Sequence, residues 1–137
     1  MVGKSDRQDL GQRHQFHGVQ PVLPVADVAA TAEYFRRVLG FDIDFLEGEP
    51  PIHGRVHKGD GDWGQPVYIH LSKTAPEDVR ASGELRIHVG RDLDGLFEAY
   101  RDLGVDIVFP PVSQPWGLRE FALREINGHI LRFCAEV

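Results

Sequence analysis

A seven-residue stretch occurs twice in this chain of 137 residues. The first copy, LGFDIDF, covers residues 39–45, and the second, LGVDIVF, covers residues 103–109. Five of the seven residues are identical. In each copy a glycine follows an amphipathic helical pattern and precedes a short alternating strand, as happens where a helix ends and a strand begins. The repeat therefore predicts a fold built from two similar modules.

The same kind of segment precedes each copy of the repeat. An extended, apolar-rich run leads to Asp27 or Asp92, whose carboxylate can accept hydrogen bonds from the free amides of a helix's first turn. Apolar residues then recur at three- and four-residue intervals. This spacing predicts helices from the two aspartates to Leu39 and to Leu103.

Short alternating segments predict four strands in each half of the chain. They lie at about 16–26, 42–47, 54–59 and 66–72 in the first half, and at about 84–89, 105–109, 118–125 and 129–135 in the second. Asn127-Gly128, between the last two strands, suits a tight hairpin. Each half is predicted to run strand, helix, strand, strand, strand. This order places the chain in the α+β class, with two βαβββ modules.

Length and charge limit the possible functions. The chain is long enough for one domain with modules at about 15–73 and 83–137, and the polar residues 1–14 are expected to form a disordered extension. The net charge of -6 and the lack of a Lys/Arg cluster exclude a nucleic-acid surface. Without a leader-like segment or a long apolar run, the chain is expected to be cytoplasmic and to contact no membrane. The single cysteine, Cys134, is expected in the core.

Ionisable side chains gather on one face of the fifth predicted strand. Strict alternation leaves Glu84, Arg86 and His88 together on the face opposite the core. Tyr68 and His70 alternate in the same way on the fourth predicted strand. Each histidine is either a hydrogen-bonded residue without a chemical role or a group that titrates near neutral pH and contacts a ligand.

The loop before the seventh predicted strand contains an aromatic residue and a cation. Trp116 and Arg119 follow Pro115, which stiffens the entry to the loop. They would form a lid over a cleft for a flat, polar or anionic ligand, or Trp116 would pack its indole onto the core. Motifs for a nucleophile or a phosphate-binding glycine loop are absent from the sequence. The remaining histidines lie near predicted turns or ends and are expected to be solvated: His14, His17, His53, His57 and His129.

Several segments resemble the vicinal oxygen chelate superfamily. They are PVAD at 24–27, YFRRVLGF at 34–41, PWGLREF at 115–121 and NGHILRF at 127–133. This superfamily includes glyoxalase I, extradiol dioxygenases, fosfomycin-resistance enzymes and bleomycin-resistance proteins, and the last segment is most similar to the bleomycin-resistance branch. The resemblance covers about residues 16–135. It implies two βαβββ modules whose curved mixed sheets enclose a cleft, usually in a homodimer.

The resemblance also implies four cleft positions that hold a divalent metal in some members. Here they correspond to Gln20, His70, Glu84 and Arg132. A guanidinium has no lone pair and stays charged, so Arg132 would repel a metal and would instead pair with Glu84 across the cleft. A site without a metal or another cofactor is the first expectation. A site in which Gln20, His70 and Glu84 hold Zn, Ni, Mn or Fe is the alternative.

The resemblance leads to two main functional hypotheses. The first is a metal-free homodimer that sequesters a flat or cationic small molecule, as a bleomycin-resistance-like protein of antibiotic resistance would. The second is a metal-dependent, glyoxalase-like lyase or a dioxygenase that acts on a substrate with two adjacent oxygens. A structural dimer partner with a vestigial cleft is a third possibility. The ligand-binding residues expected under the first hypothesis are Gln20, Tyr68, His70, Glu84, Arg86, His88, Trp116, Arg119 and Arg132.

Overall fold

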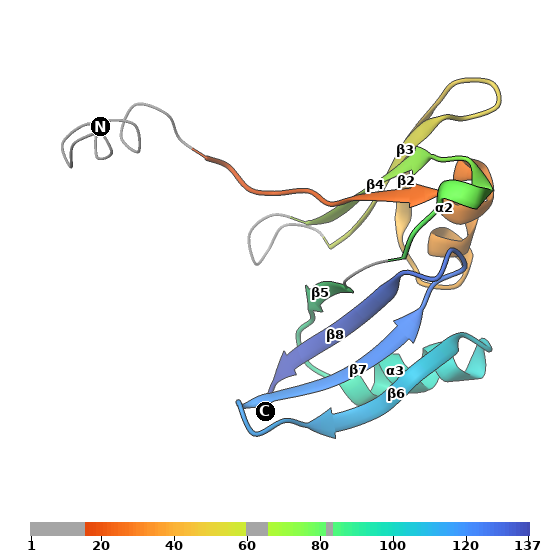
Figure 1. Cartoon of the computed structure of the whole chain (residues 1–137). Helices are drawn as coiled ribbons and strands as arrows, with labels where there is room; N and C mark the ends of the chain where they lie inside the picture. Colours follow the sequence, from red (N-terminus) through yellow and green to blue (C-terminus); the bar gives the residue numbers. More distant parts are fainter. Residues whose placement is uncertain (1–15, 60–65, 82–83) are drawn as a thin grey trace, which may run out of the picture.

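The computed structural model describes residues 16–59, 66–81 and 84–137, so the extension expected at 1–14 lies outside the described residues. The described residues form two four-stranded sheets, each with one helix against it (Figure 1). The first module contains β1 (Val22–Val25), α2 (Val28–Arg37), β2 (Asp42–Glu47), β3 (His53–Lys58) and β4 (Val67–Lys73). The short 3-10 helix η1 (Pro76–Asp78) follows it in the chain. The second module contains β5 (Glu84–His88), α3 (Leu93–Asp102), β6 (Asp106–Ser113), β7 (Leu118–Arg124) and β8 (Ile130–Glu136).

The two sheets have equivalent strand orders, β1-β4-β3-β2 and β5-β8-β7-β6. In each sheet the first strand of the module runs parallel to the last, and the other neighbours are antiparallel. The predicted α+β class and its two βαβββ modules are thus confirmed. Among those residues, no helix combines the length and the apolar character needed to cross a membrane.

The first strand is shorter than predicted. It begins at Val22 rather than at Phe16, and the side chains of Phe16 and Val19 are almost fully exposed. Val22 aligns with His70 in the parallel ladder, so residues before Val19 would lie beyond Val67, where β4 begins. Because β4 offers those residues no partner, they stay outside the sheet. The start of a strand far away in the sequence therefore explains why residues 16–18 do not belong to β1.

Both predicted helix starts and both helix-to-strand joints are confirmed. The backbone amide three residues further on donates to Asp27 Oδ1 at 2.9 Å and to Asp92 Oδ1 at 3.1 Å. After the helices, Gly40 and Gly104 have φ values of +80° and +82°, a left-handed conformation that a side chain disfavours. The helix α2 ends at Arg37, slightly earlier than predicted.

We expect Gly104→Ala to lower the free energy of unfolding by about 1 kcal/mol, because alanine is strained at positive φ. The space itself would accept the added methyl group, since no atom lies within 4 Å of it. Gly90→Ala is the matched control, because its methyl group also meets open space and its φ lies outside the left-handed region. Urea denaturation followed by circular dichroism measures both changes. If both substitutions lowered the free energy of unfolding equally, the left-handed φ of Gly104 would not be the reason for a glycine at this position.

Hydrogen bonds connect the two modules. The Tyr100 hydroxyl of α3 donates to the Leu39 carbonyl at 2.7 Å. In the turn between β7 and β8, Asn127 Oδ1 accepts from Ala26 N–H at 3.1 Å, and Asn127 Nδ2 donates to Thr31 Oγ1 at 3.0 Å. Figure 1 shows this turn next to the lower end of α2. The modules thus share polar contacts as well as a continuous apolar core.

His129 is buried, so the prediction that it is solvated is wrong. Its side chain lies beneath the surface, and Nε2 is 2.8 Å from the Pro24 carbonyl oxygen. The turn beside it packs against the first module, so a segment distant in sequence covers the imidazole. Turn chemistry alone does not reveal such a contact.

Candidate functional site

Each sheet has one apolar face toward its helix and one face of polar and aromatic side chains. Ile69, Leu71 and Ile87 are buried, which confirms the alternation predicted for β4 and β5. On the first sheet, the polar side, here called the first face, consists of Gln20, Asp44, Phe45, Glu47, His53, Arg55, His57, Tyr68 and His70. On the second sheet, the second face consists of Glu84, Arg86, His88, Phe109, Glu120, Arg132 and Cys134.

A row of polar contacts crosses the first face. His70 Nε2 lies 2.6 Å from Gln20 Oε1, and His70 Nδ1 lies 3.0 Å from His53 Nε2. The two imidazole planes differ by 8°, and Glu47 Oε2 lies 3.5 Å from His53 Nδ1. Burial and the charges of His53 and Arg55 lower the pKa of His70, so this imidazole is neutral at pH 7. The structure thus brings Gln20 and His70 together and adds His53, which is half-buried rather than solvated as predicted.

Flat groups stack beside this row. The Arg55 guanidinium lies 4.4 Å from the centre of the Tyr68 ring and 5.4 Å from that of the Phe45 ring. Asp44 accepts a hydrogen bond of 2.8 Å from Arg55 and also contacts Nδ1 of His57, which is also half-buried rather than solvated as predicted. A guanidinium held beside aromatic rings presents a planar surface to which a flat, delocalised group can bind.

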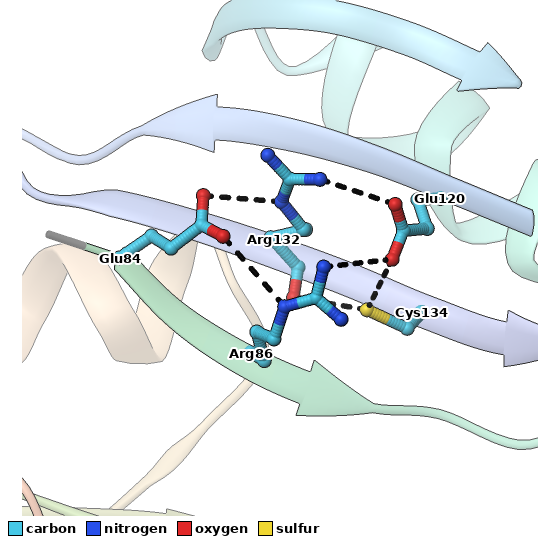
Figure 2. Close-up of polar contacts among 5 residues, drawn as sticks. All are labelled: Glu84, Arg86, Glu120, Arg132 and Cys134. Carbon is cyan, nitrogen blue, oxygen red and sulfur yellow. Dashed lines mark hydrogen bonds and ion pairs between the residues drawn. The ribbon is translucent and has the colours of Figure 1, made fainter. Parts of the chain in front are cut away.

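Four charged side chains form a closed ring on the second face (Figure 2). Arg132 Nε donates to Glu84 Oε2, and Arg132 Nη1 donates to Glu120 Oε1, both at 3.1 Å. Arg86 lies 3.6 Å from Glu84 Oε1 and 3.3 Å from Glu120 Oε2. The Cys134 thiol donates to Glu120 Oε2 at 3.3 Å. Two guanidinium and two carboxylate charges balance within this ion ring of Glu84, Arg86, Glu120 and Arg132.

The surroundings of Glu120 keep the ring charged. Burial alone would raise the pKa of Glu120, but hydrogen bonds from Cys134 and Arg132 and the charge of Arg86 lower that pKa below its ordinary value. Burial would lower the pKa of Arg132, but the charge of Glu84 and its bond to Glu120 raise it. Burial and the neighbouring carboxylate raise the pKa of Cys134 to about 11, so it remains a thiol at neutral pH.

The ion pair between Glu84 and Arg132 is present as predicted, but its partners lie on neighbouring strands of one sheet rather than across a cleft. Glu120, the buried member of the ring, is absent from the prediction. A signal for it exists in the sequence, because Phe121 and Leu123 are core residues of β7. Their positions turn Glu120 to the opposite face by strand alternation.

The structure does not bring Arg119 and Trp116 to the ion ring. Arg119 shares its side of β7 with Phe121, and its guanidinium donates to Asp94 of α3 at 2.8 and 2.9 Å and to Ser113 Oγ at 3.0 Å. The hydrogen bonds from Arg119 lower the pKa of Asp94. Trp116 lies in the turn before β7 and is largely exposed. A lid over the second face would need Arg119 on the other side of the sheet.

One cavity of about 280 Å³ lies against the first face, where Gln20 and Tyr68 line it together with Pro66. A larger cavity of about 550 Å³ lies where the modules meet, between Tyr34 and the turn at 124–128. The larger one contains none of the expected ligand-binding residues, so its size alone does not make it the candidate site. His88 is exposed at the end of β5, on the second face beyond Arg86.

The residues at the four implied metal positions do not fit a metal site. Gln20 and His70 lie on the first face, whereas Glu84 and Arg132 lie on the second. Both oxygens of Glu84 face guanidinium groups, and Arg132 offers only N–H donors. Within the part of the chain that the structure describes, no three His, Cys, Asp or Glu side chains are grouped so that they could hold an ion. A metal would have to displace an ion pair and tolerate an adjacent cation.

Residues 17–133 match the profile of the Glyoxalase/Bleomycin resistance protein/Dioxygenase superfamily. The chain belongs to this superfamily, as its two βαβββ modules already indicate. No match is found among curated proteins.

Solved structures share the fold over nearly the whole chain. The bleomycin-binding protein from bleomycin-producing Streptomyces verticillus, complexed with copper(II)-bleomycin, is 28% identical, with a TM-score of 0.71 over 90% of this chain and 99% of that one. TioX from Micromonospora sp. ML1 is 26% identical, with a TM-score of 0.64 over 88% and 100% of the two chains. A glyoxalase-related enzyme from Clostridium phytofermentans is 22% identical, with a TM-score of 0.70 over 90% and 98%, and supports the fold alone.

Proposed function

We propose that this chain is a metal-free small-molecule binding protein that sequesters a flat or cationic compound. The observation that carries the proposal is the position of Arg132. This guanidinium stands where the resemblance implies a metal-binding acid, and it donates to both Glu84 and Glu120 at 3.1 Å. A metal-dependent reaction would therefore lack one ligand and would have to recruit a carboxylate already engaged in an ion pair.

The first face supports a flat ligand. Arg55 over Tyr68, together with the nearly parallel imidazoles of His53 and His70, provides planar groups beside the smaller cavity. Carboxylates on the same face are compatible with a cationic group on the ligand. Similarity to a protein whose structure holds copper(II)-bleomycin points in the same direction.

The proposal includes a homodimer in the cytoplasm that contributes to resistance against the compound it binds. Phe16, Val19 and Val22 are exposed apolar residues along one extended segment, and such surfaces often mark a contact with a partner chain. The free thiol of Cys134 suits a reducing compartment such as the cytoplasm.

Metal analysis and calorimetry on the full chain, purified without chelator, test the proposal. We expect substoichiometric Zn, Ni, Mn and Fe, the mass of a dimer in sedimentation equilibrium, and binding of proflavine, a flat cation, in calorimetry. Binding should be unaffected by EDTA, because Arg132 occupies the position of a metal ligand. One tightly held divalent ion per chain would contradict the metal-free assignment.

A metal-dependent lyase or dioxygenase is the second candidate. The contact of 2.6 Å between Gln20 and His70 favours it, because these are two of the implied metal positions. In that case His70→Ala would remove both the bound ion and turnover of a substrate with adjacent oxygens. His57→Ala is the matched control, since His57 lies on the same face but contacts Asp44 instead.

A further inference from the structure

The two guanidiniums of the ion ring are held in different ways. Arg132 makes two hydrogen bonds of 3.1 Å, and its side chain is 21% exposed. The side chain of Arg86 is 43% exposed, and its contacts with Glu84 and Glu120 are 3.6 and 3.3 Å long. Within the described residues neither contact of Arg86 has the geometry of a hydrogen bond. Arg132 is therefore committed to the protein, whereas Arg86 still has N–H donors to offer.

The ring is neutral as a whole but uneven in depth. Glu120 is fully buried, whereas Arg86 is the most exposed member of the ring. An anion that approaches the second face therefore meets guanidinium N–H groups first. A cation would find only Glu84 accessible, and that carboxylate already accepts from Arg132. The geometry favours binding of a negative group at the second face.

Apolar surface adjoins these donors. The Arg132 guanidinium lies 5.2 Å from the centre of the Phe109 ring, so it forms a flat surface next to the charged groups. His88 is exposed two residues beyond Arg86 on the same strand. A planar molecule could lie beside Phe109 and Arg132 and extend an oxygen-bearing group toward Arg86.

We propose that Arg86 anchors a carboxylate of the sequestered ligand, which makes the ligand a flat compound with an oxyanion that binds at the second face. This inference rests on the proposed small-molecule binding and specifies the chemical class of the ligand. A guanidinium can hold a carboxylate through two parallel N–H···O bonds, and the exposed edge of Arg86 is free of such bonds within the described residues.

Calorimetry with three flat probes of equal shape tests the anchor. The probes are naphthoate, neutral naphthamide and cationic naphthylmethylammonium. We expect the wild-type full chain to bind naphthoate about tenfold more tightly than naphthamide, as one charge-assisted hydrogen-bonded pair would provide. Arg86→Gln should remove this preference by weakening the binding of naphthoate. Arg86→Lys should retain part of it, because lysine keeps the charge but loses the paired donors.

Arg119→Gln is the matched control, since Arg119 belongs to the same sheet but bonds to Asp94 on its other side. It should leave the preference for naphthoate intact. The proposed role of Arg86 would be wrong if naphthoate and naphthamide bound with equal affinity, or if the preference for naphthoate survived both Arg86 substitutions. Neither result would contradict the proposed small-molecule binding. Selective binding of naphthylmethylammonium would also overturn it, in favour of a cationic ligand. If none of the probes nor proflavine binds, the proposed function itself fails.

Discussion

Replacing Glu120 by glutamine is expected to lower the free energy of unfolding by about 3 kcal/mol. Glu120 is fully buried, and its carboxylate neutralises Arg132 and Arg86 and accepts from the Cys134 thiol. Glutamine has nearly the same volume, so the loss is electrostatic. After the substitution, two guanidinium charges share Glu84 alone. Urea denaturation at pH 7, followed by circular dichroism, measures the difference.

Glu84→Gln is the matched control for this prediction. Glu84 belongs to the same ion ring, but its side chain is 33% exposed, so water can solvate the guanidiniums that lose their partner. We therefore expect a loss of less than about 1 kcal/mol. If both substitutions lowered the free energy of unfolding equally, the burial of Glu120 would not determine how much this residue contributes to stability.

The same carboxylate makes stability depend on acidity. Since the pKa of Glu120 in the folded chain lies below its ordinary value, the folded state binds the proton less tightly than the unfolded state does. The resulting stabilisation is fully present above the unfolded pKa of about 4.3 and is lost as the pH falls through the folded pKa. The urea midpoint of the wild type should therefore fall more steeply on acidification than that of Glu120→Gln. Parallel pH profiles would contradict the depressed pKa.

Asn127→Ala is expected to lower the free energy of unfolding by about 2 to 3 kcal/mol. The side chain accepts from Ala26 N–H and donates to Thr31 and to Glu125 at 2.9 Å. Alanine removes these bonds and leaves polar groups at the junction of the modules without partners. The change in the urea midpoint at constant slope measures the loss.

Ile126→Ala controls for a change in the turn itself. Ile126 precedes Asn127 but is mainly exposed, so its truncation should alter stability by less than about 0.5 kcal/mol. If both substitutions had the same small effect, the hairpin turn would not fasten the second module to the first. The polar connections between the modules would then be the bond from Tyr100 to Leu39 and the contact of His129 with Pro24.

The scaffold was largely predictable because its signals are local. The capping carboxylates Asp27 and Asp92 and the glycines Gly40 and Gly104 act within a few residues of their own positions, and the structure confirms all four. The burial of His129 was not predictable in this way. It follows from packing between segments about a hundred positions apart, which no local pattern reveals.

The candidate site was predictable only in part. Alternation placed Glu84 and Arg86 on one face, but the register that sets Arg86 beside Arg132 is a property of the assembled sheet. Arg119 and Glu120 are a different case. Phe121 is a core residue, so it fixes the side on which each of its neighbours in β7 lies. Had strict alternation been applied to β7, the predicted ligand-binding residues would have included Glu120 instead of Arg119.

The two faces of this duplicated scaffold differ in how freely they can change. On the first face the side chains contact one another at the surface, while the core behind them is complete without them. On the second face a substitution of Glu120 itself must be matched by a change in the guanidiniums that this buried acid neutralises. A preference for a new ligand can therefore arise through single substitutions on the first sheet. On the second sheet, a change at the buried acid has to be accompanied by a compensating change in a guanidinium. Diversification of ligand preference in descendants of this chain should accumulate mainly on β3 and β4.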